Sequence, residues 1–176
     1  MRCLPPMTAF LVVAVLMHAE VRGQDSSAPP PEMKVLEKLA GTWKVLNINK
    51  PSKWAPDESR TNSTDKGAVI LGRRFLERRG FDDEGNLIHT STYTYDTEKK
   101  AYLWWFYVSD GAFGEFIGTW IADRQTLIFR PRSESRLTGV TTIHFLDEKT
   151  FDWSIIAKDA DGEIGFHMEG NAVRQK

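Results

Sequence analysis

The sequence predicts an all-β protein, an antiparallel up-and-down β-barrel of about 8 to 10 strands with one short N-terminal helix. The first observation is a series of turn-forming clusters, most of them spaced about 11 to 16 residues apart, at residues 82–86, 96–99, 109–111, 122–124, 147–149 and 159–162. The second is that the stretches between them are rich in β-branched and aromatic residues and show no helical period. A meander of this length must protect its edge strands, and closure into a barrel removes the edges altogether.

The first 23 residues have the pattern of a signal peptide. Arg2 provides a positive charge, and residues 7–17 form an apolar run that is too short for a bilayer, which needs about 20 apolar residues. We expect cleavage after Ala19 or Gly23 and export to the periplasm or the extracellular space. Cys3, the one cysteine, is removed with this segment, so we expect the rest of the chain to fold without disulfides.

Residues 24–31 are a polar, Pro-rich tether, and residues 32–176 are the expected barrel domain. Residues 32–40 have apolar positions at helical spacing, and Gly41 is a natural stop. Residues 42–49 follow as the first strand. Residues 50–66 are predicted to be irregular and to lie over one mouth of the barrel, with Trp54 held between Pro51 and Pro56.

Charge and motif content exclude several classes of function. The chain has 23 basic and 24 acidic residues and a net charge of -1, so there is no bulk electrostatic reason to bind nucleic acid or an anionic membrane. We expect no membrane association once the signal peptide is removed. There is no nucleophile elbow, phosphate loop, zinc-protease motif or dinucleotide fingerprint. No catalytic residue is assigned, and the sequence leaves open both whether the protein is an enzyme and whether it forms oligomers.

A resemblance to known barrels begins with the motif Leu39-Ala40-Gly41-Thr42-Trp43. It continues through residues 72–77, 93–96, 116–120 and 172–174. Together these segments resemble lipocalin-like (calycin-type) barrels, in particular a family of exported bacterial barrel domains of unknown function. The resemblance implies that Gly41 opens the first strand and that Trp43, two residues later, packs at the closed end beneath Arg174. Nitrobindin-type haem barrels are similar in shape, but here Lys44-Val45-Leu46 stands where their glycine signature follows the Trp.

The histidines are candidates for a site inside the barrel. Strand residues alternate faces, so His89 shares a face with Tyr93 and Tyr95, and this aromatic face is expected to point inward. The same alternation sends His144 and His167 toward solvent, although a wet lumen would reverse this. If haem binds, its ligand is expected to be His89 or His167; no other metal site is expected.

Two further candidates come from the middle of the chain. Glu115 shares a face with Phe113 and Ile117; inside an apolar barrel its carboxyl would have a raised pKa and could act as acid or base, and otherwise it is an exposed strand residue. Residues 102–107 put aromatic rings on both faces of one strand. We expect one set to fill the lumen, with Trp105 as a candidate, and the other to be covered by the helix, the irregular segment or a partner.

The favoured function is non-enzymatic binding of a small apolar or aromatic molecule in the lumen. One alternative is a haem-binding or enzymatic barrel that uses a lumenal His or Glu, and another is a filled barrel that acts as an interaction module. No cofactor is expected unless the barrel binds haem. The candidate ligand-binding residues are His89, Tyr93, Tyr95, Trp105, Glu115 and Trp54.

Overall fold

The structure is a computed structural model that describes residues 28–132 and 138–176. The expected signal peptide at residues 1–23, its Cys3 and the first part of the expected tether lie outside the described residues. Within the described part, no helix is long and apolar enough to cross a membrane.

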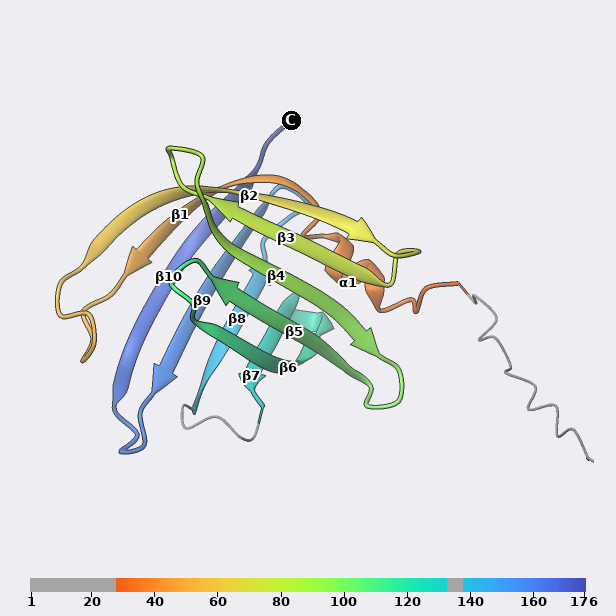
Figure 1. Cartoon of the computed structure of the whole chain (residues 1–176). Helices are drawn as coiled ribbons and strands as arrows, with labels where there is room; N and C mark the ends of the chain where they lie inside the picture. The colour runs from red at the N-terminus through yellow and green to blue at the C-terminus, as the bar shows by residue number, and fades with distance from the viewer. Residues whose placement is uncertain (1–27, 133–137) are drawn as a thin grey trace, which may run out of the picture.

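Ten antiparallel strands form one closed barrel, so the predicted fold class is confirmed (Figure 1). Each strand pairs with the next along the chain, and the last strand pairs with the first. The elements in order are α1 (Met33–Glu37), β1 (Gly41–Asn49), β2 (Ser59–Ile70), β3 (Phe75–Phe81), β4 (Leu87–Asp96), β5 (Ala101–Val108), β6 (Phe113–Ile121), the 3-10 helix η1 (Ala122–Arg124), β7 (Thr126–Pro131), β8 (Thr138–Phe145), β9 (Thr150–Lys158) and β10 (Ile164–Arg174).

Five of the six predicted turn clusters fall between strands, and the cluster at residues 96–99 begins on Asp96, the last residue of β4; the irregular segment was predicted too long. Strand β2 begins at Ser59, so only residues 50–58 connect it to β1. The first half of β2 escaped prediction because it is polar on both faces. Its inward residues Ser63 and Asp65 are buried, at 2% and 5% exposure, and therefore give no apolar alternation.

The closed end of the barrel is covered by α1, whose Met33 and Leu36 are buried, together with Leu39 just after it. Trp43 on β1 lies beneath this cap and is 1% exposed. Its Nε1 donates a hydrogen bond to the Leu39 carbonyl at 3.1 Å, and the Arg174 guanidinium lies 4.3 Å from its ring centre. A cation over an indole contributes about 0.5–2 kcal/mol.

Arg174 also ties the end of β10 to the cap. Its guanidinium donates hydrogen bonds to the carbonyls of Ala40, Lys38 and Glu148. Gly41 makes this approach possible: its φ is +101°, and a Cβ there would lie 2.7 Å from Arg174 Nη1. The Gly41–Trp43–Arg174 arrangement that the resemblance implied is therefore present as a set of contacts.

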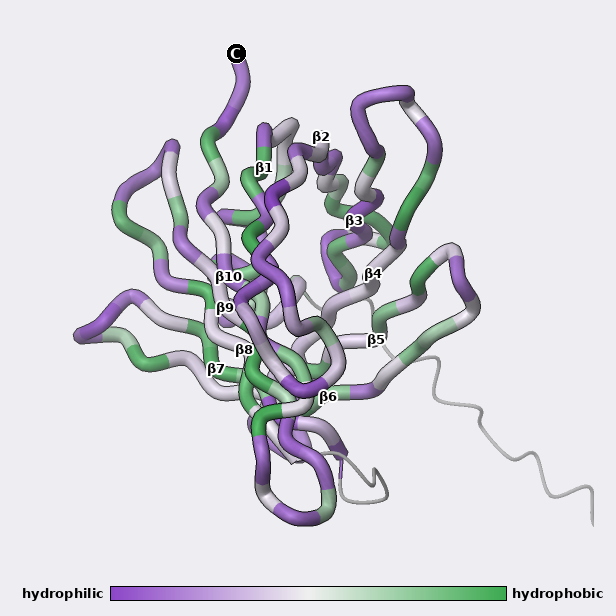
Figure 2. Tube along the Cα trace, turned by 90° about the vertical axis from the view of Figure 1, so that its left-hand side faces the viewer, coloured by the Kyte–Doolittle hydropathy of each residue, from purple (hydrophilic) through white to green (hydrophobic). Residues whose placement is uncertain are grey.

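Glycines on several strands leave room for aromatic rings. A Cβ at Gly118 would lie 2.4 Å from the Phe129 ring, and one at Gly170 would lie 2.7 Å from Trp153 Nε1. Phe129 is fully buried, and Trp153 packs against the core. The hydrophobic and hydrophilic residues that alternate along the strands can be followed in Figure 2. These rings lie inside the barrel, and the cavity that remains beside them is the candidate site.

Candidate functional site

A cavity of about 130 Å³ remains inside the barrel. It has two chemically different walls, because polar side chains reach it from β2, β3 and β4 while mainly aromatic and aliphatic side chains reach it from β5, β8 and β9. The lining residues are Val45, Asn47, Asp65, Arg78, His89, Ser91, Tyr93, Trp104, Phe106, Thr141, Ile143, Phe151, Trp153, Ile155 and Met168.

The polar wall is built on a buried ion pair. Arg78 Nη2 donates to Asp65 Oδ2 at 2.7 Å, and the two side chains are 8% and 7% exposed. His89 Nε2 lies 3.6 Å from the same carboxylate oxygen. The three residues stand on the adjacent strands β2, β3 and β4, which pair in register.

Burial by itself would raise the pKa of the Asp65 carboxyl. The positive charge of Arg78 and the nearby His89 imidazole outweigh the burial and hold this pKa below its ordinary value. Asp65 is therefore a carboxylate at neutral pH, and its charge is balanced by Arg78 across the pair.

Gly80 gives His89 its position. Gly80 lies between Asp65 and His89 in the register of β2, β3 and β4, and the imidazole lies across it. A Cβ at Gly80 would be 2.1 Å from His89 Cε1, so only glycine leaves space for the ring. The missing side chain lets His89 reach toward a carboxylate two strands away.

The aromatic wall centres on Trp104. Its ring stacks on Tyr93, with centroids 5.6 Å apart and an interplanar angle of 3°, and on Phe116 at 4.3 Å. Phe106 lies beside it and also contacts the His89 ring at 5.6 Å. Interlocked rings of this kind form a rigid, apolar surface opposite the ion pair.

Four polar atoms on cavity-lining residues are buried and have no hydrogen-bond partner. These are Asp65 Oδ1, Arg78 Nε, Trp104 Nε1 and Trp153 Nε1. Buried polar groups are nearly always paired, so each such atom needs an explanation. Three of the four are N–H groups that can only donate.

The sequence-predicted residues divide between the cavity and other places. His89 and Tyr93 line the cavity. Tyr95 is on the same strand but lies at the closed end, where its ring packs edge-on against Tyr102, whose hydroxyl donates to the Glu32 carbonyl. A role in ligand binding stays a prediction for all of them.

Trp105 does not line the lumenal cavity, contrary to the expectation, and of the two alternatives for Glu115 the exposed strand residue holds. Trp105 Nε1 donates to Glu115 Oε1 at 3.1 Å, and Glu115 Oε2 pairs with Arg132 at 2.9 Å, with the Glu115 side chain 48% exposed. The inward positions of β5 and β6 belong instead to their neighbours Trp104 and Phe116. The sequence could not settle which face was inward, because apolar residues occupy both.

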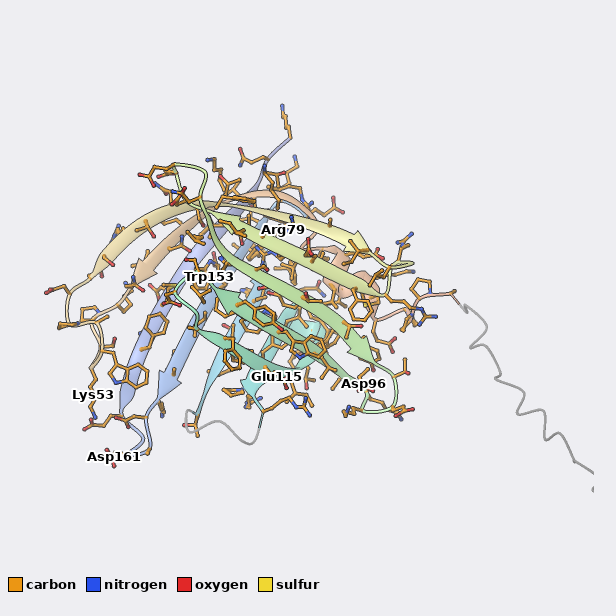
Figure 3. All side chains as sticks on the ribbon, in the orientation of Figure 1. Lys53, Arg79, Asp96, Glu115, Trp153 and Asp161 are labelled. Carbon is orange, nitrogen blue, oxygen red and sulfur yellow. The ribbon has the colours of Figure 1, made fainter. Side chains whose placement is uncertain are left out.

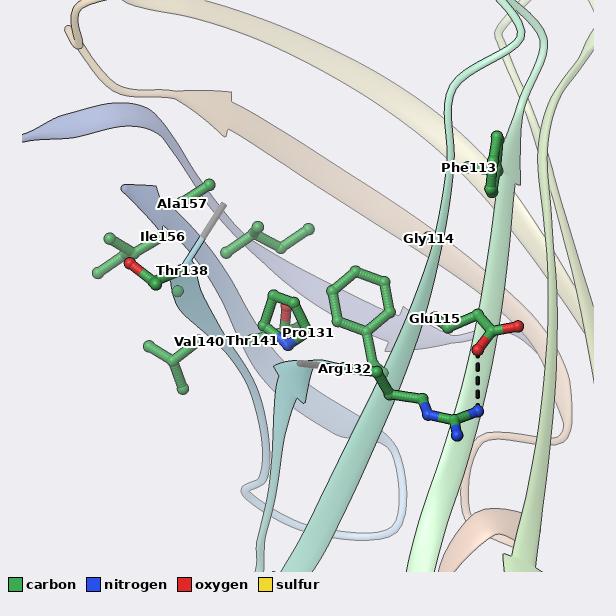
Figure 4. Close-up of a pocket in the computed structure, with 13 residues that line it drawn as sticks. Phe113, Gly114, Glu115, Pro131, Arg132, Thr138, Val140, Thr141, Ile156 and Ala157 are labelled. Carbon is green, nitrogen blue, oxygen red and sulfur yellow. Dashed lines mark hydrogen bonds and ion pairs between the residues drawn. The ribbon is translucent and has the colours of Figure 1, made fainter. Parts of the chain in front are cut away.

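Glu115 and Arg132 line a second pocket, of about 520 Å³, shown in Figure 4. It lies where β7 and β8 stop pairing beyond Phe129. Thr141 and Ile155 line both pockets, so this one adjoins the lumen. The Glu115 carboxylate already has hydrogen-bond partners, unlike the four buried polar atoms on the residues that line the lumenal cavity.

Trp54 does not line the lumenal cavity either. Its ring packs on Gly165 of β10, where a Cβ would lie 2.5 Å away, and it is 51% exposed. The neighbouring Lys53 pairs with Asp159 at 2.6 Å and with Glu163 at 3.0 Å. Figure 3 shows Lys53 close to Asp161, at the opposite end of the barrel from Asp96. The segment is thus fastened to the β9–β10 hairpin.

The other histidines take the places that strand alternation predicted. His144 is exposed, and His167 lies beside Glu169 at 3.8 Å and is absent from the lining of the cavity. Among residues 28–132 and 138–176, no group of three or more His, Cys, Asp or Glu side chains is placed to hold a metal ion.

Haem does not fit the lumen as it stands. An engineered protein cavity of about 150 Å³ holds one benzene molecule. The lumenal cavity, at about 130 Å³, is slightly smaller than that, whereas a porphyrin has four pyrrole rings. His89, the one histidine in the cavity lining, is moreover directed toward Asp65.

Gly80→Ala is expected to destabilise the protein by about 1–3 kcal/mol, because the new methyl group displaces His89. Urea unfolding measures this loss. In a His89→Ala background the same substitution should cost clearly less, since the clash is gone. Equal costs in the two backgrounds would show that His89 does not lie across Gly80.

Comparison with known proteins identifies the fold and no family. No protein-family model matches the chain, and no curated protein matches it. Among solved structures, Rv2717c from M. tuberculosis has a TM-score of 0.60 and 13% identity, covering 84% of this chain and 99% of that one. The S-type phycobiliprotein lyase CPES from Guillardia theta has a TM-score of 0.53 and 16% identity, covering 81% and 92%.

A third structure is a DUF3598-family protein of unknown function from Nostoc punctiforme, with a TM-score of 0.56 and 13% identity. The match covers 80% of this chain and 48% of that one, so this chain spans about half its length. These likenesses, with the closed barrel of ten strands, fit a lipocalin-like barrel. The finer assignment to an exported bacterial family stays a prediction.

Proposed function

We propose that the protein binds one small, largely aromatic or apolar molecule inside its barrel. The observation that carries the proposal is the lumenal cavity of about 130 Å³, walled by Trp104, Phe106 and Trp153. Its volume is close to that of a cavity that holds a single benzene ring. Concave, mostly apolar sites with a few polar groups are typical of small-molecule binding.

A filled barrel is the competing hypothesis, and the cavity weighs against it. One water molecule needs about 10–15 Å³ of such space, so the lumen has room for a ligand rather than for isolated waters alone. The phycobiliprotein lyase of similar fold is compatible with a barrel that holds a ligand, but it names no ligand for this chain. We further propose that the protein acts outside the cytoplasm, as the N-terminal pattern suggests.

Toluene is expected to stabilise the protein against heat by binding in the lumen. A ligand that binds only the folded state, present at a hundred times its Kd, contributes about 2.7 kcal/mol. Differential scanning fluorimetry at increasing toluene concentration measures the rise in Tm. Absence of any rise at saturating toluene would contradict the proposal.

A pair of matched variants locates the site. Ile155→Phe adds volume inside the cavity and should abolish the toluene effect, because Ile155 lines it. Ile117→Phe makes the same change at a position that is 37% exposed and should leave the effect intact. If both variants respond alike, toluene binds somewhere other than the lumen.

A further inference from the structure

The two walls of the lumen define the kind of molecule that would satisfy it. Resting on the proposed function, we infer that the ligand is an uncharged single-ring aromatic compound with a carbonyl-type oxygen. The ring packs against the aromatic wall, and the oxygen accepts a hydrogen bond from an unpartnered lumenal N–H group. The argument has three steps: size, hydrogen-bonding capacity and charge.

Size limits the ligand to one ring with a small substituent. The cavity holds about 130 Å³, and Trp104 is wedged between Tyr93 and Phe116, so it cannot swing away without breaking both stacks. Thr141 and Ile155 line both the cavity and the neighbouring pocket, so a short substituent would have to be directed toward these two side chains. A fused polycyclic ring system would require the aromatic wall to be rebuilt.

Among the buried polar atoms without a partner on cavity-lining residues, donors outnumber acceptors. Arg78 Nε, Trp104 Nε1 and Trp153 Nε1 are buried N–H groups without acceptors, against one free acceptor, Asp65 Oδ1. Neither an arginine nor an indole can accept a hydrogen bond, so no rearrangement among these donors can satisfy them. A ligand that brings an acceptor oxygen corrects the imbalance, after a small side-chain adjustment exposes one of these buried donors.

Charge decides between a neutral and an anionic acceptor. Arg78 and Asp65 are 2.7 Å apart and compensate each other, so the ion pair leaves no net charge for a carboxylate ligand to neutralise. Placing a further anion beside Asp65 would bury an uncompensated charge, which is costly. An aldehyde, ketone or amide oxygen accepts the same hydrogen bond without that cost.

Three compounds of similar size separate these ideas: acetophenone, benzoate and cumene. Acetophenone has a neutral acceptor, benzoate a charged one and cumene none. We expect acetophenone to bind about tenfold more tightly than cumene in isothermal titration calorimetry, since one hydrogen bond gives about this difference. Benzoate should bind more weakly than acetophenone.

Nuclear magnetic resonance identifies the donor. In a ¹⁵N-labelled sample, acetophenone should move at least one of the Arg78 Nε–H, Trp104 Nε1–H and Trp153 Nε1–H signals downfield, and cumene should not. Trp105 Nε1–H is the internal control, because it is already bonded to Glu115. Its signal should stay in place with every compound.

Replacing the donor that responds completes the test: Trp104→Phe or Trp153→Phe if an indole moves, and Arg78→Lys if the guanidinium moves. The preference for acetophenone over cumene should then disappear, whereas Trp105→Phe should retain it. If acetophenone and cumene bind equally well, the acceptor inference fails and the proposed function stands. If benzoate binds best, the charge argument fails. If none of the three binds although toluene does, the inference about the ligand fails; if toluene does not bind either, the proposed function itself fails.

Discussion

Trp43→Ala is expected to lower the free energy of unfolding by about 3–5 kcal/mol, the usual range for a buried tryptophan replaced by alanine. Trp43 is 1% exposed and packs edge-on against Phe151 with centroids 4.7 Å apart. The substitution opens a void beneath the helical cap and also removes the surface on which Arg174 stacks. Urea unfolding followed by circular dichroism measures the loss.

Two controls test the assignment of this loss to the closed end. Trp54→Ala removes an indole that is 51% exposed and should cost far less. Arg174→Ala should cost about 1–2 kcal/mol, and less once Trp43 is already absent, because the stacking partner is gone. An unchanged midpoint for Trp43→Ala would rule out its role under the cap.

Arg78→Met is expected to cost about 3–5 kcal/mol, because it leaves the buried Asp65 carboxylate without its counter-charge. The double variant Asp65→Leu/Arg78→Met should recover most of this loss, since a buried ion pair replaced by apolar residues is often close to neutral. Arg79→Met is the matched surface control. Its pair with Glu77 is 2.8 Å long, but the arginine is 56% exposed, so we expect less than about 1 kcal/mol.

In Arg78→Met, the dependence of the free energy of unfolding on acid pH should change sign. In the native protein the pKa of Asp65 is below its ordinary value, so its stabilising contribution is present above about pH 4 and is lost as the pH falls through the folded-state pKa. Without Arg78, burial raises this pKa instead, and protonation at acid pH should partly relieve the destabilisation. The measurement is the free energy of unfolding at a series of acid pH values. If it falls equally with decreasing pH in the wild-type protein and in Arg78→Met, Asp65 is not coupled to Arg78.

The sequence predicted the architecture well because the barrel is specified by local signals. Turn clusters such as residues 159–162 mark strand ends directly, and closure follows from the need to protect edges. The polar wall could not be predicted in the same way. Asp65 lies in a stretch that is polar on both faces, so the sequence does not reveal that it is in a strand.

The sequence also did not determine which face of each strand points into the barrel. A shift of one residue exchanges the two faces of a strand, so Trp104 and Trp105 are equivalent until the strand is placed. On β6 the apolar pattern was misleading, because Phe113 is 77% exposed while Gly114 and Gly118 leave space for rings. Glycines that alternate with an aromatic residue were the available signal for the inward face. His89, on a strand with a clear aromatic face, was placed in the lumen by the same alternation.

Pairing of the first strand with the last has a consequence for how the chain folds during synthesis. Arg174 bonds to Ala40, 134 residues earlier, so the contacts that seal the barrel connect the two ends of the domain. Strand β1 can pair with β2 at an early stage of synthesis, but its other edge stays unpaired until β10, the last of the ten strands, has been made. Until then the growing sheet exposes an unpaired edge that can recruit other chains. Folding of this domain is therefore expected to wait for the synthesis of β10, and a nascent chain stalled before Arg174 would be a strong candidate for chaperone binding.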